Sequence, residues 1–257
     1  MAAISINGLT VRFGEVLAVD DLSVDIEQGE FVSIVGPSGC GKTTVLNLLT
    51  GLVPLMQGRI ALNGKTPVLG NPDVAYMLAR DSLLPWRSAL ENAAYGMEIR
   101  GVAEARRRDR ARELLERVGL KGFERHYPKM LSHGMRQRCA LARTFCLDSP
   151  VMLMDEPFGA LDAQTKLQLE DLLLQLWTEH RRTVVFITHD LAEAVALSDR
   201  VLVMSARPGR IVADMRIPLA RPRSVRELQK DRHFLDIYAE VWTRLEEGLA
   251  STAPVPA

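Results

Sequence analysis

Residues 31–44 read FVSIVGPSGCGKTT and join a strand pattern to a glycine-rich loop. The first part, residues 31–36, is an apolar run ending in glycine, which is typical of a strand buried on both faces of a sheet. The second part, residues 36–44, fits the pattern G-x-x-x-x-G-K-[ST], and helical spacing follows in residues 42–52. A strand, this loop and a helix in that order predict a phosphate-binding loop rather than a chance run of glycines.

The predicted loop carries the groups that a nucleoside triphosphate needs. Its glycines let successive backbone N–H groups curl around phosphate oxygens, and the helix N-terminus adds partial positive charge. We expect Lys42 to reach the β- and γ-phosphates and to act in catalysis, and the Thr43 hydroxyl to ligate magnesium. ATP and Mg²⁺ are therefore the expected cofactors. The expected cofactor-binding residues of the loop are Gly36, Pro37, Ser38, Gly39, Cys40, Gly41, Lys42, Thr43 and Thr44.

Two later strand patterns end in polar side chains that hydrolysis requires. VMLMD (151–155) predicts a buried strand that ends at Asp155, a candidate magnesium ligand, and Glu156 can orient the attacking water as a general base. His189 ends the strand pattern TVVFITH (183–189), and strand ends in open α/β sheets line the ligand crevice. A strand running into a helix N-cap would explain an isolated Asp-Glu pair, but the phosphate loop favours the catalytic interpretation.

The composition sets limits on the class of protein. The chain has 257 residues, 47% of them hydrophobic, which is an ordinary globular mixture. Its 32 basic residues balance 32 acidic ones, so we expect no nucleic-acid partner. We also expect neither a membrane-spanning segment nor a signal peptide. The three cysteines, Cys40, Cys139 and Cys146, lack metal-ligand spacing and predict free thiols in a reduced compartment.

The order of the patterns predicts an α/β fold with a P-loop NTPase core and a mostly parallel sheet. Short strand patterns in residues 1–30 predict an N-terminal antiparallel β-subdomain, and strands alternating with a helix over residues 151–206 predict the parallel sheet. Residues 87–148 are helical in pattern throughout and predict an inserted α-helical subdomain. The arginine cluster of residues 103–120 interleaves with acidic residues, so it reads as a solvated helix face.

These patterns predict one domain with an internal division. The expected boundaries are a single domain over 1–257, a nucleotide-binding core with the β-subdomain over 1–86 and 149–218, the helical subdomain over 87–148, and a C-terminal helical extension and tail over 219–257. Within the extension, residues 218–228 predict a linker rich in proline and arginine, residues 231–249 a helix, and residues 251–257 a disordered tail.

With these motifs assembled, residues 4 to about 218 closely resemble the ATP-binding subunit of an ABC transporter. GPSGCGKTT (36–44) resembles the Walker A motif, and VMLMDE (151–156) the Walker B motif. The other three matches are LSHGMRQR (131–138) with the signature motif, GALD (159–162) with the D-loop, and THD (188–190) with the switch histidine loop.

The resemblance implies a sandwich dimer, formed with a second copy of the chain or with a paralogous ATPase subunit. Each ATP is then held between the Walker motifs of one subunit and Ser132 and Gly134 of the other, while Asp162 contacts the opposite subunit. Phe13 lies where the family stacks an aromatic ring on adenine. ATP closes such a dimer and hydrolysis opens it.

The stretch DSLLPWRSALENAAYG (81–96) resembles the importer subfamily that serves nitrate, sulfonates and taurine. The family docks a coupling helix of a transmembrane permease subunit on this region, which implies a peripheral location at the cytoplasmic face of the membrane. A periplasmic or extracellular solute-binding protein would take part indirectly. Two interpretations of Trp86 remain open, a partner surface and ordinary core packing. The alternative functions are a soluble ABC-type ATPase that is not coupled to transport and, more distantly, a P-loop kinase.

Two positions depart from the family pattern. Ala79 stands where the Q-loop glutamine is expected, and a hypothesis follows that coupling to the permease runs through Arg80 and residues 81–86. His133 stands where the signature turn usually has glycine. Its ring either points away from the nucleotide and is merely tolerated, or places a titratable donor near phosphate.

Overall fold

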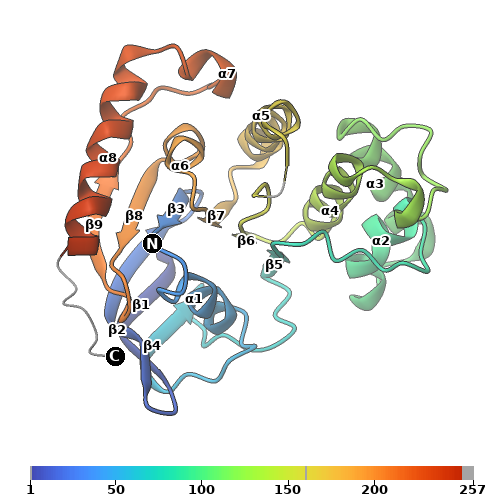
Figure 1. The fold of residues 1–257 in the computed structure, drawn as a ribbon. Helices are drawn as coiled ribbons and strands as arrows, with labels where there is room; N and C mark the ends of the chain where they lie inside the picture. Colours follow the sequence, from blue (N-terminus) through green and yellow to red (C-terminus); the bar gives the residue numbers. More distant parts are fainter. Residues whose placement is uncertain (1, 160, 251–257) are drawn as a thin grey trace.

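The computed structural model describes residues 2–159 and 161–250, and its centre is a six-stranded sheet (Figure 1). The strand order is β5-β6-β7-β3-β8-β9. Five of these strands are parallel, and β9 is antiparallel to β8 at one edge. The strands are β3 (Phe31–Val35), β5 (Val74–Met77), β6 (Val151–Asp155), β7 (Thr183–Ile187), β8 (Arg200–Met204) and β9 (Ile211–Arg216). The predicted α/β fold with a mostly parallel sheet is therefore confirmed.

The middle strands are buried on both faces, which explains why they read as apolar runs. Every residue of β3, β6 and β7 is buried. Alternate residues enter two different cores: Val32 and Ile34 face one core, whereas Phe31 and Val35 face the other. Side chains that alternate across a pleated strand produce this division, and covering both faces requires a layer on each side.

The first layer is a three-stranded antiparallel sheet together with one helix. Its strands pair in the order β2-β1-β4. This layer consists of β1 (Ala2–Phe13), β2 (Val16–Glu27), β4 (Gln57–Leu62) and α1 (Lys42–Leu49), and it encloses one of the two cores.

The second layer is helical and lies on the opposite face (Figure 1). It consists of α5 (Ala163–His180), α6 (Leu191–Leu197), α7 (Val225–Leu228) and α8 (Arg232–Ala250).

The chain between β5 and β6 forms a separate group of helices beyond the β5 edge, here called the helical lobe (Figure 1). Arg100 fixes the lobe to the sheet, because its guanidinium donates hydrogen bonds to the carbonyls of Leu147 and Val74 at 2.9 and 3.1 Å. The lobe consists of α2 (Ala89–Ile99), α3 (Glu104–Arg117), a short 3₁₀ helix (Pro128–Met130) and α4 (His133–Cys146).

Residues 218–228, expected to be a linker, are packed against the core instead. The Arg221 guanidinium lies 4.2 Å from the centre of the Trp177 ring and pairs with Asp199 at 2.8 Å. Arg223 donates hydrogen bonds to the carbonyls of Ala196 and Ser198 at the end of α6. The arginines therefore fasten the C-terminal helices to the sheet. The tail expected at 251–257 lies outside the described residues.

No helix within residues 2–159 and 161–250 combines the length and the apolar character needed to cross a bilayer.

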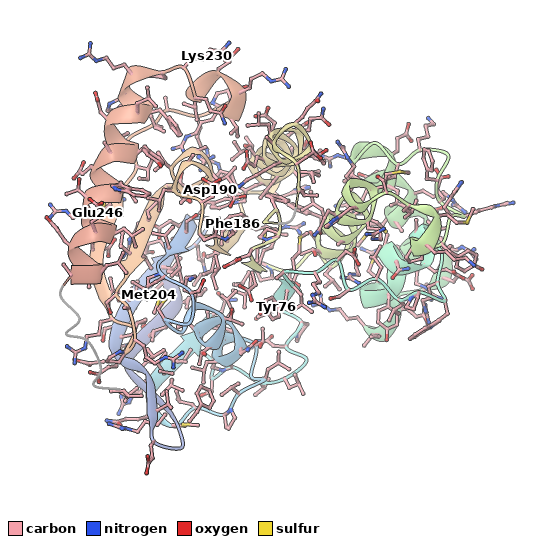
Figure 2. All side chains as sticks on the ribbon, in the orientation of Figure 1. Tyr76, Phe186, Asp190, Met204, Lys230 and Glu246 are labelled. Carbon is pink, nitrogen blue, oxygen red and sulfur yellow. The ribbon has the colours of Figure 1, made fainter. Side chains whose placement is uncertain are left out.

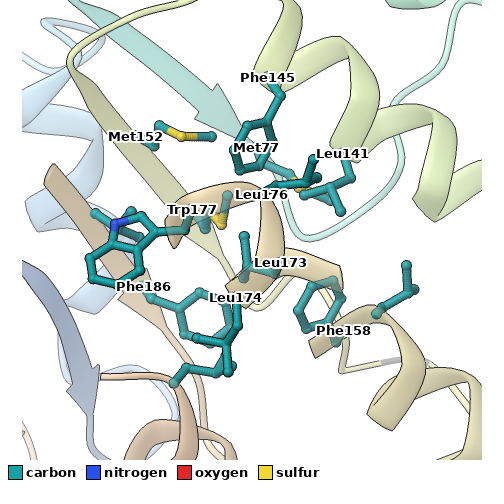
Figure 3. Close-up of a cluster of buried hydrophobic side chains, with 14 of the residues drawn as sticks. Met77, Leu141, Phe145, Met152, Phe158, Leu173, Leu174, Leu176, Trp177 and Phe186 are labelled. Atoms are coloured by element: carbon teal, nitrogen blue, oxygen red, sulfur yellow. The ribbon is translucent and has the colours of Figure 1, made fainter. Parts of the chain in front are cut away.

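Trp177 of α5 is the largest fully buried side chain. It packs edge-on against Phe31, with ring centres 5.6 Å apart, and its Nε1–H donates to the Arg182 carbonyl at 2.6 Å. Figure 3 shows it among the buried side chains that join α5 to the sheet and to α4, including Phe186, Met152 and Leu176.

We expect Trp177→Ala to lower the free energy of unfolding by about 3–5 kcal/mol, because a large cavity opens in this core. Trp242→Ala is the matched control, since Trp242 is 46% exposed. Urea denaturation of both variants measures the difference. Equal losses of stability in the two variants would contradict the packing described here.

Candidate nucleotide-binding site

The glycine-rich loop lies between β3 and α1, at the carboxyl end of the parallel strands. Gly41 is the N-cap of α1 and has a positive φ of 103°. A Cβ atom at Gly41 would lie 2.7 Å from Val19 Cγ2 and 3.2 Å from the Ala18 carbonyl oxygen. Only glycine therefore allows β2 to pack this closely behind the loop.

Lys42 is held inside the curve of the loop. Its Nζ donates hydrogen bonds to the carbonyl oxygens of Gly36 and Pro37 at 2.8 and 3.0 Å, and the residue is 6% exposed. These two hydrogen bonds hold the ammonium group at the start of α1, where the helix N-terminus also favours an anion.

Thr43 and Asp155 bring the loop and the end of β6 together. The Thr43 hydroxyl donates to Asp155 Oδ2 at 2.9 Å. Burial and, to a smaller extent, the charge of Glu156 raise the pKa of Asp155, whereas the Thr43 hydrogen bond and Lys42 oppose the rise. A hydroxyl and a carboxylate at one point form an oxygen donor set of the kind that Mg²⁺ prefers.

Glu156 and His189 meet at the ends of neighbouring strands. Nδ1 of His189 lies 3.1 Å from Glu156 Oε2. A carboxylate oxygen accepts hydrogen bonds, so this contact forms in the tautomer that carries hydrogen on Nδ1. Glu156 has a positive φ of 44°, a conformation that costs free energy for a residue with a Cβ atom. Its amide N–H donates to the Ile187 carbonyl at 2.9 Å, which helps to hold this turn in place.

Of these groups, Lys42, Thr43 and Glu156 border a hollow of about 510 Å³ in front of the loop. Phe13, at the end of β1, lines it and is 48% exposed, so its ring is available to a planar ligand. The structure thus brings most of the predicted loop residues, Glu156 and Phe13 around one hollow. Within the described residues, the predicted Walker and switch residues that do not line it are Gly36, Pro37, Cys40, Asp155 and His189. The lining residues are Phe13, Val16, Ala18, Ser38, Gly39, Gly41, Lys42, Thr43, Thr44, Glu156 and Arg207.

Ser132, Gly134 and Asp162 lie elsewhere: across residues 2–159 and 161–250, none of them lines this hollow. Ser132 is the N-cap of α4 and accepts a hydrogen bond from the Met135 amide at 3.3 Å. A Cβ at Gly134 would lie 2.8 Å from Thr165 Cγ2, so this turn packs against the first turn of α5, where Asp162 is the N-cap. His133 is the first residue of α4; its φ is not positive and its side chain is exposed.

The segment after β5 is exposed and rigidly braced. Trp86 is 70% exposed, so the core interpretation of this residue was wrong. The Asn92 amide group donates to the carbonyls of Leu84 and Arg87 at 3.1 and 2.9 Å and shapes the turn that presents Trp86. Ala79 and Arg80 are also exposed, and neither lines the hollow within the described ranges.

Two residues of the site were missed by sequence reasoning. Tyr76 lies on β5, a strand that was not predicted, and its pKa is raised by burial and then by the charge and hydrogen bond of Asp155. The Tyr76 hydroxyl also lies 3.4 Å from Asn47 Oδ1. The second residue, Arg207, donates from Nε and Nη2 to the Gly39 carbonyl at 3.2 Å each. An isolated arginine in a turn gives no sequence signal for this contact.

Comparison with known proteins agrees with this geometry. The family model described as "ABC transporter" matches residues 19–159. An ATP-binding protein of Brucella abortus is 44% identical over 240 residues, which cover 93% of this chain and 92% of the relative. The taurine import ATP-binding protein TauB of Rhizobium johnstonii is 41% identical over 249 residues, covering 94% and 95% of the two chains.

Among solved structures, the dimeric MJ0796, a bacterial ABC transporter cassette, superposes with a TM-score of 0.74 at 30% identity. The match covers 84% of this chain and 100% of that one. The structure of cbiO1 from Clostridium perfringens shares the fold, with a TM-score of 0.75 at 20% identity over 95% of this chain and 97% of that one.

The phosphate loop, the Thr43–Asp155 pair and the Glu156–His189 pair lie at one edge of the sheet, where Lys42, Thr43 and Glu156 line the hollow. The chain belongs to the ABC transporter family, as an ATP-binding subunit with ATPase activity.

We expect Arg207→Ala to weaken ATP and ADP binding by about 3- to 10-fold. The substitution removes a positive charge from the expected phosphate site and the hydrogen bonds that hold the loop at Gly39. Arg210→Ala is the matched control: it removes the same charge from the same turn, but Arg210 pairs with Asp20 and does not line the hollow. Titration calorimetry measures the affinities. An unchanged Kd in Arg207→Ala would contradict a contact between Arg207 and the nucleotide.

Proposed function

We propose that this chain is the motor of an ABC importer that takes up a small anionic solute of the nitrate, sulfonate or taurine kind. It would work through ATP-dependent closure of a dimer, as a peripheral subunit at the cytoplasmic face of the membrane. The observation that carries the proposal is the meeting of Lys42, the Thr43–Asp155 pair and the Glu156–His189 pair at one sheet edge. Relatives named for taurine import, at 38–41% identity, support the importer assignment.

The proposed chemistry assigns one task to each group. Lys42 would leave the loop carbonyls and pair with the β- and γ-phosphates, while the backbone N–H groups of residues 36–44 cradle them. Glu156 would orient and deprotonate the attacking water, and His189 would donate to the transferred phosphoryl group. Phe13 would stack on adenine.

Mg²⁺ fits the oxygen donors of Thr43 and Asp155, which are the residues that would hold it. A bound magnesium ion supplies neutralisation of phosphate charge. The Thr43 hydroxyl and Asp155 Oδ2 lie 2.9 Å apart, so both oxygens lie at one point beside the loop.

The position of the signature turn supports a dimer. Ser132 and Gly134 do not line their own chain's hollow, and Ser132 is exposed at the start of a helix whose N-terminus favours anions. On this proposal they complete the ATP site of a partner subunit. Asp162 meets the same partner, because Thr165 contacts both Gly134 and Asp162.

Trp86 and its surroundings support a permease contact. Trp86 is 70% exposed, and Leu52, Val68 and Leu69, on other loops, are 54%, 59% and 70% exposed. The loop at Gly51 packs on the backbone of residues 68–69, which brings the last three together. Exposed aromatic and apolar side chains on a braced turn are typical of a protein-binding surface.

We expect Trp86→Ala to weaken association with the membrane subunit by about 30-fold, the cost of removing an interface hot spot. Co-purification from detergent-solubilised membranes measures association, and uptake of labelled taurine and nitrate by cells measures transport. Trp242→Ala is the control, because it removes an exposed tryptophan from α8. A chain that never co-purifies with a multi-span subunit, yet hydrolyses ATP, would instead be a soluble ABC-type ATPase.

A further inference from the structure

An ionic cluster that is buried at its two glutamates and partly exposed at Asp190 joins α5 to the start of α6, next to His189. The Nζ atom of Lys166 lies 2.8 Å from Asp190 Oδ2, 3.6 Å from Glu193 Oε1 and 3.9 Å from Glu170 Oε1. Glu170 and Glu193 are 2% and 3% exposed. Figure 2 shows Asp190 at the beginning of α6 beside α5. No member of the cluster lines the nucleotide hollow within the described part of the chain.

The cluster holds both chain neighbours of His189. The Thr188 hydroxyl donates to Glu193 and accepts from the Asp190 amide at 3.0 Å. Asp190 caps α6 by accepting from the amides of residues 192 and 193 at 2.9 and 3.2 Å. The His189 side chain itself is 59% exposed. Its position therefore depends on the backbone on either side, which these contacts fix.

We propose that Lys166 is a positioning residue for His189, tying residues 188–190 to α5 through Asp190, Glu193 and Glu170. The inference rests on the role proposed above for His189. Lys166 lies one turn after Asp162, the residue proposed to meet the partner subunit, on the same helix. Movement of α5 at the dimer contact would therefore reach His189 through one ammonium group.

The charges of the cluster do not balance when all its groups are ionised. Three carboxylates, of Glu170, Asp190 and Glu193, face the single ammonium of Lys166, and a buried unpaired charge is costly. Burial, first of all, raises the pKa of Glu170 to about 8 and that of Glu193 to about 7, from an ordinary value of 4.5. The charge of Glu193 adds to the rise at Glu170, whereas Lys166 opposes it. The cluster therefore retains a proton near neutral pH.

The sign of the pH effect follows from these raised values. Near neutral pH the folded chain keeps a proton on the Glu170–Glu193 pair, whereas the unfolded chain has released it. Stability therefore falls as pH rises, and the contribution of the pair is present at low pH. It is fully present below about pH 4.5, the ordinary pKa value, and its loss is complete once pH has risen through about 7 to 8, the folded pKa values of the pair. Glu170→Gln keeps the shape of the side chain and removes its titration.

The first test compares Lys166→Met with Lys166→Arg and with Lys121→Met, which breaks an exposed ion pair in the helical lobe. Steady-state ATP hydrolysis is measured on the full chain. We expect Lys166→Met to lower kcat by about 10- to 100-fold, the cost of a misplaced catalytic group, with less than about a twofold change in KM for ATP. Lys166→Arg should restore most of kcat. Wild-type kcat in folded Lys166→Met overturns the proposal.

The second test uses Glu170→Gln and holds even where Lys166→Met fails to fold. We expect the ratio of its kcat to the wild-type kcat to rise severalfold from about pH 6.5 to about pH 9, and its Tm to fall less over that range. A ratio that does not change with pH overturns the proposal. His189→Ala distinguishes a failure of the proposed function from a failure of this inference. If His189→Ala keeps full hydrolysis, the proposed role of His189 is wrong. If His189→Ala loses hydrolysis while Lys166→Met keeps it, only the positioning role of Lys166 is wrong.

Discussion

The hydrogen bond between Thr43 and Asp155 is the contact on which the site depends. It joins two residues 112 positions apart in the chain, one in the first turn of α1 and the other at the end of β6. The contact requires the sheet order β6-β7-β3, because that order brings the two strand ends to one edge. All three strands are buried on both faces, and Gly41 lets β2 pack closely behind the loop.

Glu156 and His189 extend the same arrangement. Because Glu156 follows Asp155 directly and His189 follows Thr188 after β7, the register of β6 on β7 places their side chains together. Phosphoryl transfer needs positioned charges more than covalent chemistry, so a rigid sheet edge suits it. The cluster around Lys166 lies behind this edge and holds the backbone on both sides of His189, whose own side chain is largely exposed.

Much of this could be predicted from the sequence, because the decisive signals are local. The strand–loop–helix order of residues 31–52 predicted the phosphate loop, and the runs at 151–155 and 183–189 predicted central strands, the second of which ends at Ile187 in the structure. β5 was missed because its four residues, Val74–Met77, are too short to show a period, and Tyr76 was missed with it. β9 was missed because it is a half-exposed edge strand, whose signal depends on its pairing with β8.

Contacts between distant segments could not be predicted either. Arg207 meets Gly39 across 168 residues, and the arginines at 221 and 223 turn an apparent linker into a packed segment. The turn that exposes Trp86 is held by Asn92, a contact between near neighbours, but neither residue type marks such a turn in the sequence.

The central proposal is that Ser132 of one subunit completes the ATP site of another. Its most direct test mixes a chain carrying Ser38→Cys with a chain carrying Ser132→Cys, both in a Glu156→Gln background that slows hydrolysis. Both serines are exposed, whereas the native Cys40, Cys139 and Cys146 are buried thiols whose pKa values burial raises, so the introduced cysteines react first. The sandwich arrangement predicts a disulfide between the two chains that forms with ATP and magnesium and not without them. No such disulfide, or one that forms equally well without nucleotide, would contradict it.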